Sequence, residues 1–189
     1  MKMKISISKL GLIILLIAAF AVCGLAQKSE SFECVRATPE PIIKKEVYPQ
    51  TTFVLRKNKY FPFNDIGFET VKFRNGDKLT IEHSGCENYA LIFRFETSRY
   101  NGKPADARFW YKKAVQLMQQ AKKGFGSNNL IDRGMKALNS YIKNNRTLRF
   151  AKEISFGGEE IRDVVFFNQV KKRKGNKYEV ELSFSTGPL

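Results

Sequence analysis

The sequence predicts an α+β fold, in which an antiparallel sheet of about seven strands carries a two-helix hairpin inserted after the fourth strand. Two observations lead to this prediction. Apolar and polar residues alternate in several short segments, which is typical of strands with one buried face. Between these segments, apolar residues recur every three or four positions, which is typical of amphipathic helices. A two-sheet sandwich is the structural alternative.

The first two strands and the first turn are predicted from residue types. The segments TTFVLRK from Thr51 and ETVKFR from Glu69 are rich in β-branched and aromatic residues, and we expect a loop between them that includes Gly67. Asn75 and Gly76 then predict a tight hairpin, because an Asn-Gly pair accepts the positive φ angles of a two-residue turn.

Strict alternation predicts the next two strands. KLTIEHS begins at Lys78, and YALIFRFE begins at Tyr89. The alternation places His83, the single histidine of the chain, on the apolar face and its neighbour Glu82 on the opposite face. We therefore expect His83 to be a packed core residue.

The helical hairpin is predicted from its ends and its apolar stripes. Pro104 suits a first helical turn, and Asp106 is placed to interact favourably with the helix N-terminus. We expect this helix to end near residues 124–126 and the second to follow Asn128 or Asn129 as its cap. Both helices should cover one face of the sheet with the stripes Ala107, Trp110, Tyr111, Ala114, Leu117, Met118 and Ala121, and Leu130, Ile131, Gly134, Met135, Leu138, Tyr141 and Ile142.

Three more strands complete the predicted sheet. They are LRFAKEISF from Leu148, IRDVVFFNQV from Ile161 and KYEVELSF from Lys177. Two consecutive glycines join the first pair, and the basic turn KKRKGNK joins the second pair. Together with the first half, these segments predict a single domain over residues 51–189.

The first 26 residues have the features of a secretory signal. Lysines at positions 2, 4 and 9 precede an apolar run, and small residues stand where a signal peptidase cleaves, so we expect cleavage after Ala26. The protein would then be secreted or periplasmic, with no transmembrane segment after signal removal. A retained anchor or a lipid on Cys23 is the alternative.

The mature chain is expected to begin with a leader and to contain one disulfide. Residues 27–50 contain three prolines, which predicts an extended or loosely ordered leader. Cys34 and Cys86 are the only cysteines left after signal removal, and in an oxidising compartment they are expected to form a disulfide. A catalytic thiol at Cys86, assisted by His83, is the alternative to the disulfide.

The mature protein is strongly basic, because signal removal takes away three lysines and no acidic residue and so lowers the net charge from +15 to +12. Such a charge attracts anionic partners, although charged turns also protect sheet edges from aggregation. Cationic residues concentrate on the predicted first helix and on the last hairpin. The predicted basic patch comprises Lys112, Lys113, Lys122, Lys123, Lys171, Lys172, Arg173, Lys174 and Lys177.

The sequence therefore predicts a non-catalytic binding protein that recognises an anionic envelope polymer, an anionic membrane surface or an acidic protein. Nucleic acid is disfavoured because the chain has no nucleic-acid recognition motif. No cofactor or metal is expected, since the nucleotide-binding and zinc-protease motifs are also missing. The alternative function is a cell-envelope hydrolase that uses acidic residues around Glu82, His83 and Glu87. The carboxylates of Glu159 and Glu160, with Asp163 nearby, are expected to form an exposed polar turn.

Overall fold

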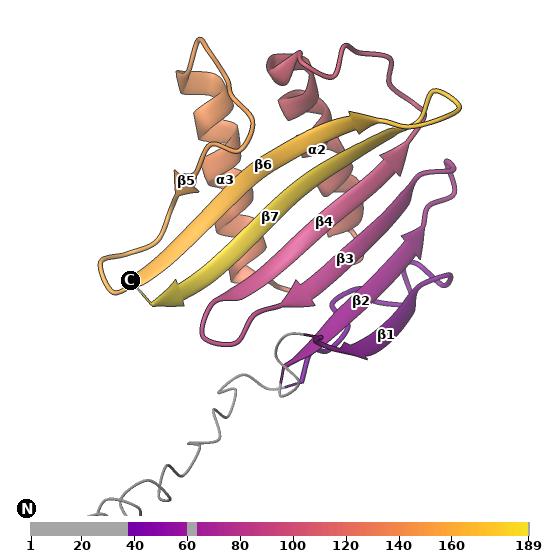
Figure 1. Ribbon diagram of the computed structural model, residues 1–189, viewed down its shortest axis with the longest axis vertical. Coiled ribbons are helices and arrows are strands. Elements are labelled where there is room, and N and C mark those ends of the chain that lie inside the picture. The colour runs from indigo at the N-terminus through magenta and orange to yellow at the C-terminus, as the bar shows by residue number, and fades with distance from the viewer. Residues whose placement is uncertain (1–37, 60–63, 189) are drawn as a thin grey trace, which may run out of the picture. The chain divides into compact units, whose positions relative to one another are not determined.

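The computed structural model describes residues 38–59 and 64–188, which form one antiparallel sheet and two helices (Figure 1). The predicted α+β fold is confirmed, and the two-sheet alternative is wrong because all the described strands belong to a single sheet. In chain order the strands are β1 (Thr52–Lys57), β2 (Asp65–Lys72), β3 (Lys78–Ser84), β4 (Tyr89–Thr97), β5 (Ile154–Ser155), β6 (Ile161–Lys172) and β7 (Tyr178–Pro188).

The spatial order of the strands is β1-β2-β3-β4-β7-β6-β5. The two halves of the chain therefore meet where β4 pairs with β7, and Phe93 lies opposite Leu182 in that pairing. The predicted hairpin between β2 and β3 is confirmed, with Gly76 at a φ of 86°. Gly67 lies within β2 rather than in a loop, because pairing with β1 extends β2 back to Asp65.

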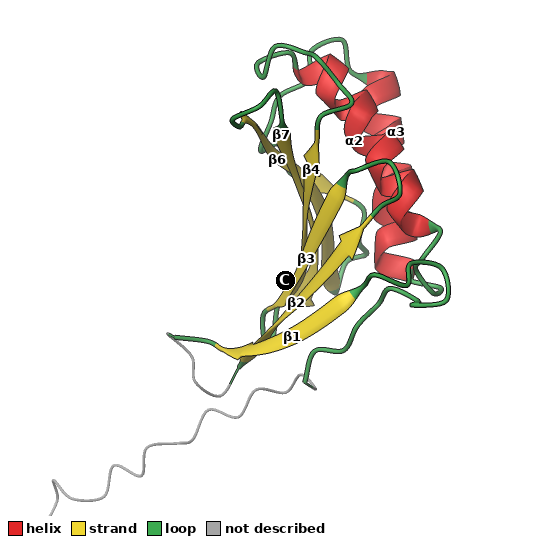
Figure 2. Ribbon diagram, turned by 90° about the vertical axis from the view of Figure 1, so that its right-hand side faces the viewer, coloured by secondary structure: helices red, strands yellow, loops and turns green. Residues whose placement is uncertain are grey.

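Both helices lie on the same face of the sheet, as predicted (Figure 2). They are α2 (Ala107–Lys122) and α3 (Asn129–Asn144). Asp106 caps α2 by accepting the Phe109 N–H at 3.0 Å, so Pro104 precedes the helix instead of occupying its first turn. Asn128 caps α3 in the same way.

The predicted strand from Leu148 is shorter than expected. Only Ile154–Ser155 is extended and paired, as β5. Upstream of it Ala151 has a φ of 54° and donates its N–H to the Phe167 carbonyl at 2.7 Å, which breaks the extended conformation. The predicted alternation therefore ends in a turn that is fixed by a contact to β6.

The core lies between the helices and the inward face of the sheet. Most residues that alternation predicted to face inward on β3, β4 and β7 are buried there, and Tyr89 of β4 is half-buried. The apolar stripes of both helices pack on the same core, with Ala107, Leu130, Tyr141 and Ile142 half-buried. Trp110 and Tyr111 of α2 are fully buried, and the Trp110 ring packs 4.7 Å from the ring of Tyr178 on β7. Burial of this apolar area holds the helices onto the sheet.

Residues 38–50, which we call the N-terminal strap, belong to the predicted leader. Ile43 in the strap is buried and forms a β-bridge with Phe125, which follows α2. The backbone N–H groups of Ile42 and Ile43 each donate to the Glu69 carboxylate at 3.0 Å. These contacts hold the strap against β2 and the end of α2.

Candidate functional site

The structure places four of the nine residues of the predicted basic patch along a series of surface hollows. Lys112, Lys113 and Lys123 of the α2 segment line hollows, and so does Lys177 from the hairpin between β6 and β7. Lys122 instead forms an ion pair with Asp132 of α3. The remaining residues of the hairpin tip, Lys171, Lys172, Arg173 and Lys174, are exposed.

The largest of these hollows, which we call the central hollow, has a volume of about 940 Å³. Three segments that are distant in the sequence form its walls: the N-terminal strap, the β2–β3 turn and the outer face of α2. No aspartate or glutamate lies among its lining residues. These residues are Val47, Tyr48, Pro49, Gln50, Lys72, Phe73, Arg74, Asn75, Gln116, Gln119, Gln120 and Lys123.

Two smaller hollows adjoin the central hollow, with volumes of about 360 and 370 Å³. One shares Gln50, Lys72 and Phe73 with it, and the other shares Gln116. We call the three hollows together the basic groove. Its eight cations are Lys72, Arg74, Lys78, Arg108, Lys112, Lys113, Lys123 and Lys177, against the three carboxylates Asp77, Glu96 and Asp106.

Helical spacing brings the α2 residues of the groove onto one stripe. Lys112, Gln116, Gln119 and Lys123 follow one another at intervals of three or four residues, so their side chains lie above one another on the helix surface. The opposite face of α2 is buried against the core. Packing of that face therefore orients the polar stripe toward the strap and the β2–β3 turn.

The carboxylates at the groove are already engaged. Asp77 is buried and accepts a hydrogen bond from Nε of Arg99 at 2.7 Å. Glu96 pairs with Lys78 at 3.1 Å, and Asp106 caps α2. In contrast, the side chains of Lys72, Arg74 and Lys123 form no ion pair with the residues that the structure describes. The side chains that line the groove therefore carry a net positive charge.

Two tyrosines border the groove, and burial raises the pKa of each above its ordinary value. Tyr48 donates its hydroxyl to the Gln120 carbonyl at 2.6 Å, and its ring meets Phe73 edge-on at 5.0 Å. At the other end, Lys113 Nζ lies 4.8 Å from the ring centre of Tyr100. Both tyrosines thus remain neutral at physiological pH and leave the charge of the groove unchanged.

No protein-family model matches the chain, and no curated protein or solved structure shows a significant match to it. Function is therefore inferred from the geometry. Within residues 38–59 and 64–188 no group of three or more His, Cys, Asp or Glu side chains is placed to hold a metal ion. The helices of the same residues are all too short or too polar to cross a membrane.

The three residues of the hydrolase alternative do not meet at one site. Glu82 lies on the sheet face without helices, where it pairs with Arg94 at 2.7 Å. His83 is buried on the helix-facing side, as predicted, with Nε2 3.5 Å from the Glu69 carboxylate. Glu87 is exposed in the turn between β3 and β4. The alternation of β3 thus separates the candidate acid from the imidazole.

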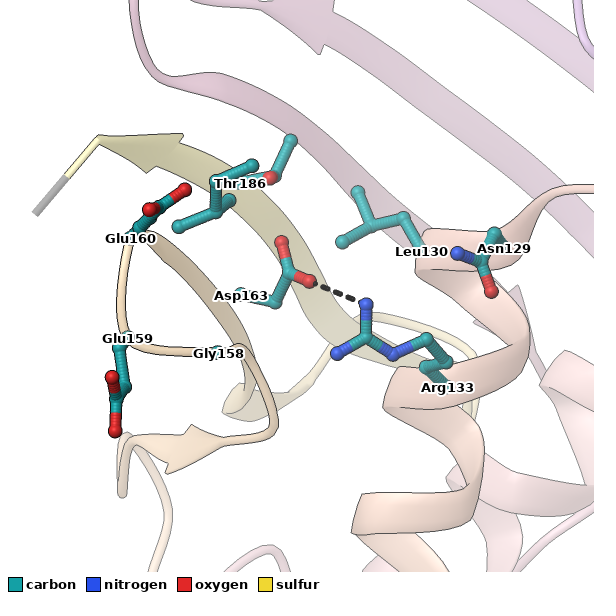
Figure 3. A pocket seen from close by; sticks show the side chains of 9 residues that line it. Asn129, Leu130, Arg133, Gly158, Glu159, Glu160, Asp163 and Thr186 are labelled. Carbon is teal, nitrogen blue, oxygen red and sulfur yellow. Dashed lines mark hydrogen bonds and ion pairs between the residues drawn. The ribbon is translucent and has the colours of Figure 1, made fainter.

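A separate hollow of about 610 Å³ contains the predicted carboxylate cluster (Figure 3). Arg133 of α3 pairs with Asp163 of β6 at 3.0 Å and also donates to the Phe156 carbonyl at 2.5 Å. Glu159 and Glu160 are exposed on the adjoining loop, and Glu159 points away from the ion pair. The exposed turn is confirmed for these two glutamates, whereas Asp163 is buried and paired.

The signal sequence and one half of the predicted disulfide lie outside the described residues. This applies to residues 1–26, to the alternative lipid site Cys23 and to Cys34. Cys86 lies in the β3–β4 turn. Cleavage after Ala26 and the Cys34–Cys86 bond therefore stay predictions.

Sequence reasoning missed the residues that the strap and the β2–β3 turn bring to the groove. Lys72 and Arg74 lie close to α2 only through tertiary packing, which no local pattern reports. The glutamines of α2 could have been found, because Gln116, Gln119 and Gln120 share the stripe of Lys112 and Lys123.

Proposed function

We propose that this chain is a secreted or periplasmic, non-catalytic binding protein that recognises an anionic surface or acidic partner through the basic groove. One observation carries the proposal: three cations without an ion-pair partner among the described residues surround a hollow that has no lining carboxylate. A cleft lined by charges of one sign concentrates the field, which draws ligands of the opposite charge. The features that residues 1–26 share with secretory signals support a location outside the cytoplasm.

The hairpin tip extends the same surface. Lys177 lines one of the smaller hollows, and Lys171, Lys172 and Lys174 are exposed on the same hairpin. Arg173 is the exception, because Glu179 pairs with it at 2.7 Å. A long anionic partner that occupies the groove is therefore expected to contact the tip as well.

The test is the binding of dextran sulfate by the purified protein, measured by calorimetry as salt rises from about 50 to about 500 mM. The groove variant combines Lys72→Gln, Arg74→Gln and Lys123→Gln. Its matched control carries the same charge change on exposed lysines outside the groove: Lys136→Gln, Lys143→Gln and Lys152→Gln.

We expect the groove variant to bind at least about tenfold more weakly, because three exposed ion pairs at about 0.5–1 kcal/mol each are lost. The slope of the logarithm of its binding constant against the logarithm of the salt concentration should also become shallower by roughly two to three, because about that many fewer counterions are released on binding. The control should change the affinity by less than about twofold, since salt screens distant charges. Equal losses in the two variants would show that only net charge matters, and salt-insensitive binding would contradict the proposal.

A further inference from the structure

The central hollow presents amides as well as cations. Five of its twelve lining residues carry a side-chain amide, whereas three carry a positive charge. Amides bind neutral oxygen atoms without the desolvation cost of a charge. The five residues are Gln50, Asn75, Gln116, Gln119 and Gln120.

Hydrogen bonds with donor-only groups fix the orientation of two of these amides. Gln120 Oε1 accepts from Arg99 at 3.0 Å and from Asn75 Nδ2 at 3.2 Å. Gln116 Oε1 accepts from Lys113 Nζ at 3.3 Å. Because guanidinium and ammonium groups only donate, these contacts occupy the amide oxygens and leave both Nε2 groups available as donors. The groove is therefore rich in donors, both charged and neutral.

The cations flank the amides along the polar stripe of α2. Lys112 and Lys113 precede the glutamines, and Lys123 follows them directly after the last residue of the helix. At 1.5 Å per helical residue, Lys112 and Lys123 are separated by about 16 Å along the axis. This separation suits an extended ligand whose charged groups are spaced by neutral oxygen atoms.

We infer that the ligand is an anionic polysaccharide, an inference that rests on the proposed function and narrows it. Its sulfate or carboxylate groups would bind the cations, and its hydroxyl and ring oxygens would accept from the amides of Gln116, Gln119 and Gln120. A polymer without hydroxyl or ring oxygens would offer these amides only its charged oxygens, which the cations of the groove already bind.

The groove suits other polyanions less well. Single-stranded nucleic acids need exposed aromatic faces for base stacking, but the Tyr48 ring is half-buried and its hydroxyl is engaged by the Gln120 carbonyl. A lipid surface binds protruding basic and apolar side chains, whereas these cations line hollows. The experiment therefore also measures binding to single-stranded DNA and to lipid vesicles.

The experiment compares dextran sulfate with inorganic polyphosphate, which has no hydroxyl groups along its chain. The amide variant combines Gln116→Leu and Gln119→Leu, which keep the side-chain size and the charge of the groove. Both positions are exposed, so the variant is expected to fold. Asn144→Leu, which removes an exposed amide of α3 outside the groove, is the matched control.

We expect the amide variant to bind dextran sulfate about fivefold to thirtyfold more weakly, as the loss of two neutral hydrogen bonds requires, and to bind polyphosphate within about twofold of the unmodified protein. The control should change neither affinity. Unchanged dextran sulfate binding, or equal losses for both polymers, would overturn the inference while leaving the proposed function standing.

Two further outcomes separate the alternatives. Tighter binding to single-stranded DNA or to phosphatidylglycerol vesicles than to dextran sulfate, unaffected by the amide variant, would overturn the inference in favour of that ligand. If the unmodified protein bound none of these anionic probes, the proposed function itself would fail.

Discussion

Replacing Glu69 should release the N-terminal strap and destabilise the fold. Glu69 is fully buried, and its carboxylate accepts the backbone N–H groups of Ile42 and Ile43 at 3.0 Å each. His83 is also buried, and its Nε2 lies 3.5 Å from the same carboxylate. Glu69 is therefore the acceptor through which β2 holds two consecutive strap residues.

The expected loss follows from the groups that would remain without a partner. In Glu69→Ala two backbone N–H groups lose their acceptor, at about 1–3 kcal/mol for each buried group. Because the Ile42 N–H is only partly buried, we expect a total of about 2–5 kcal/mol. Glu69→Gln keeps one acceptor oxygen but turns the other into a donor that faces an N–H group, so about half of that loss is expected.

The assay is urea unfolding of the purified protein, together with hydrogen exchange at the amides of residues 42 and 43. Glu96→Gln is the control, because its ion pair with Lys78 is about half exposed and should contribute at most about 1 kcal/mol. Exchange at both strap amides should accelerate in the Glu69 variants only. A loss below about 1 kcal/mol for Glu69→Ala, or unchanged exchange at these amides, would refute the reasoning.

Two further predictions concern the core. Gly134→Ala should lower the free energy of unfolding by about 1–2 kcal/mol, because the new Cβ would lie 2.6 Å from the buried Phe184 ring. The control is Gly158→Ala, whose Cβ would meet no atom within 4 Å and should leave the free energy of unfolding unchanged in the same urea titration. Burial raises the pKa of Tyr111, so this residue's contribution to stability is complete below a pH of about 10 and is lost as pH rises beyond it. Tyr111→Phe loses the hydrogen bond to the Arg149 carbonyl and should be less stable near neutral pH. Above pH 10 its free energy of unfolding should fall less steeply than that of the unmodified protein, and the two slopes should differ by up to about 1.4 kcal/mol per pH unit. An identical slope in both proteins would contradict this assignment.

The strands that the sequence predicted best are those with one face buried along their whole length. KLTIEHS matches β3 at both ends, and the alternating residues of β4 and β7 are buried as expected, except that Tyr89 is half-buried. In these strands every second side chain faces the core, so the alternation in the sequence matches the burial in the fold. The segment from Leu148 also alternates, although Lys152 interrupts the apolar series, and a backbone bond from Ala151 to Phe167 decides its conformation.

The candidate site was predictable only in part, for the same reason. The lysines of α2 could be assigned to a polar helix face because helical spacing is local. Their neighbours across the groove come from the strap and the β2–β3 turn, and their approach depends on Tyr48, Glu69 and the packing of α2. Residues brought together by such long-range contacts leave no periodic signal in the sequence.

The positive charge of the groove depends on which carboxylates form ion pairs as much as on where the lysines lie. Asp77 lies in the same turn as Arg74, yet its side chain is buried and binds Arg99. Arg99 in turn donates to Gln120, which lies on the wall of the central hollow. The acid of this turn thus holds the arginine that orients a neutral donor, while Arg74 is exposed to solvent. A surface that served solubility alone would gain nothing from this arrangement, whereas an anion-binding groove gains both a free cation and an oriented amide.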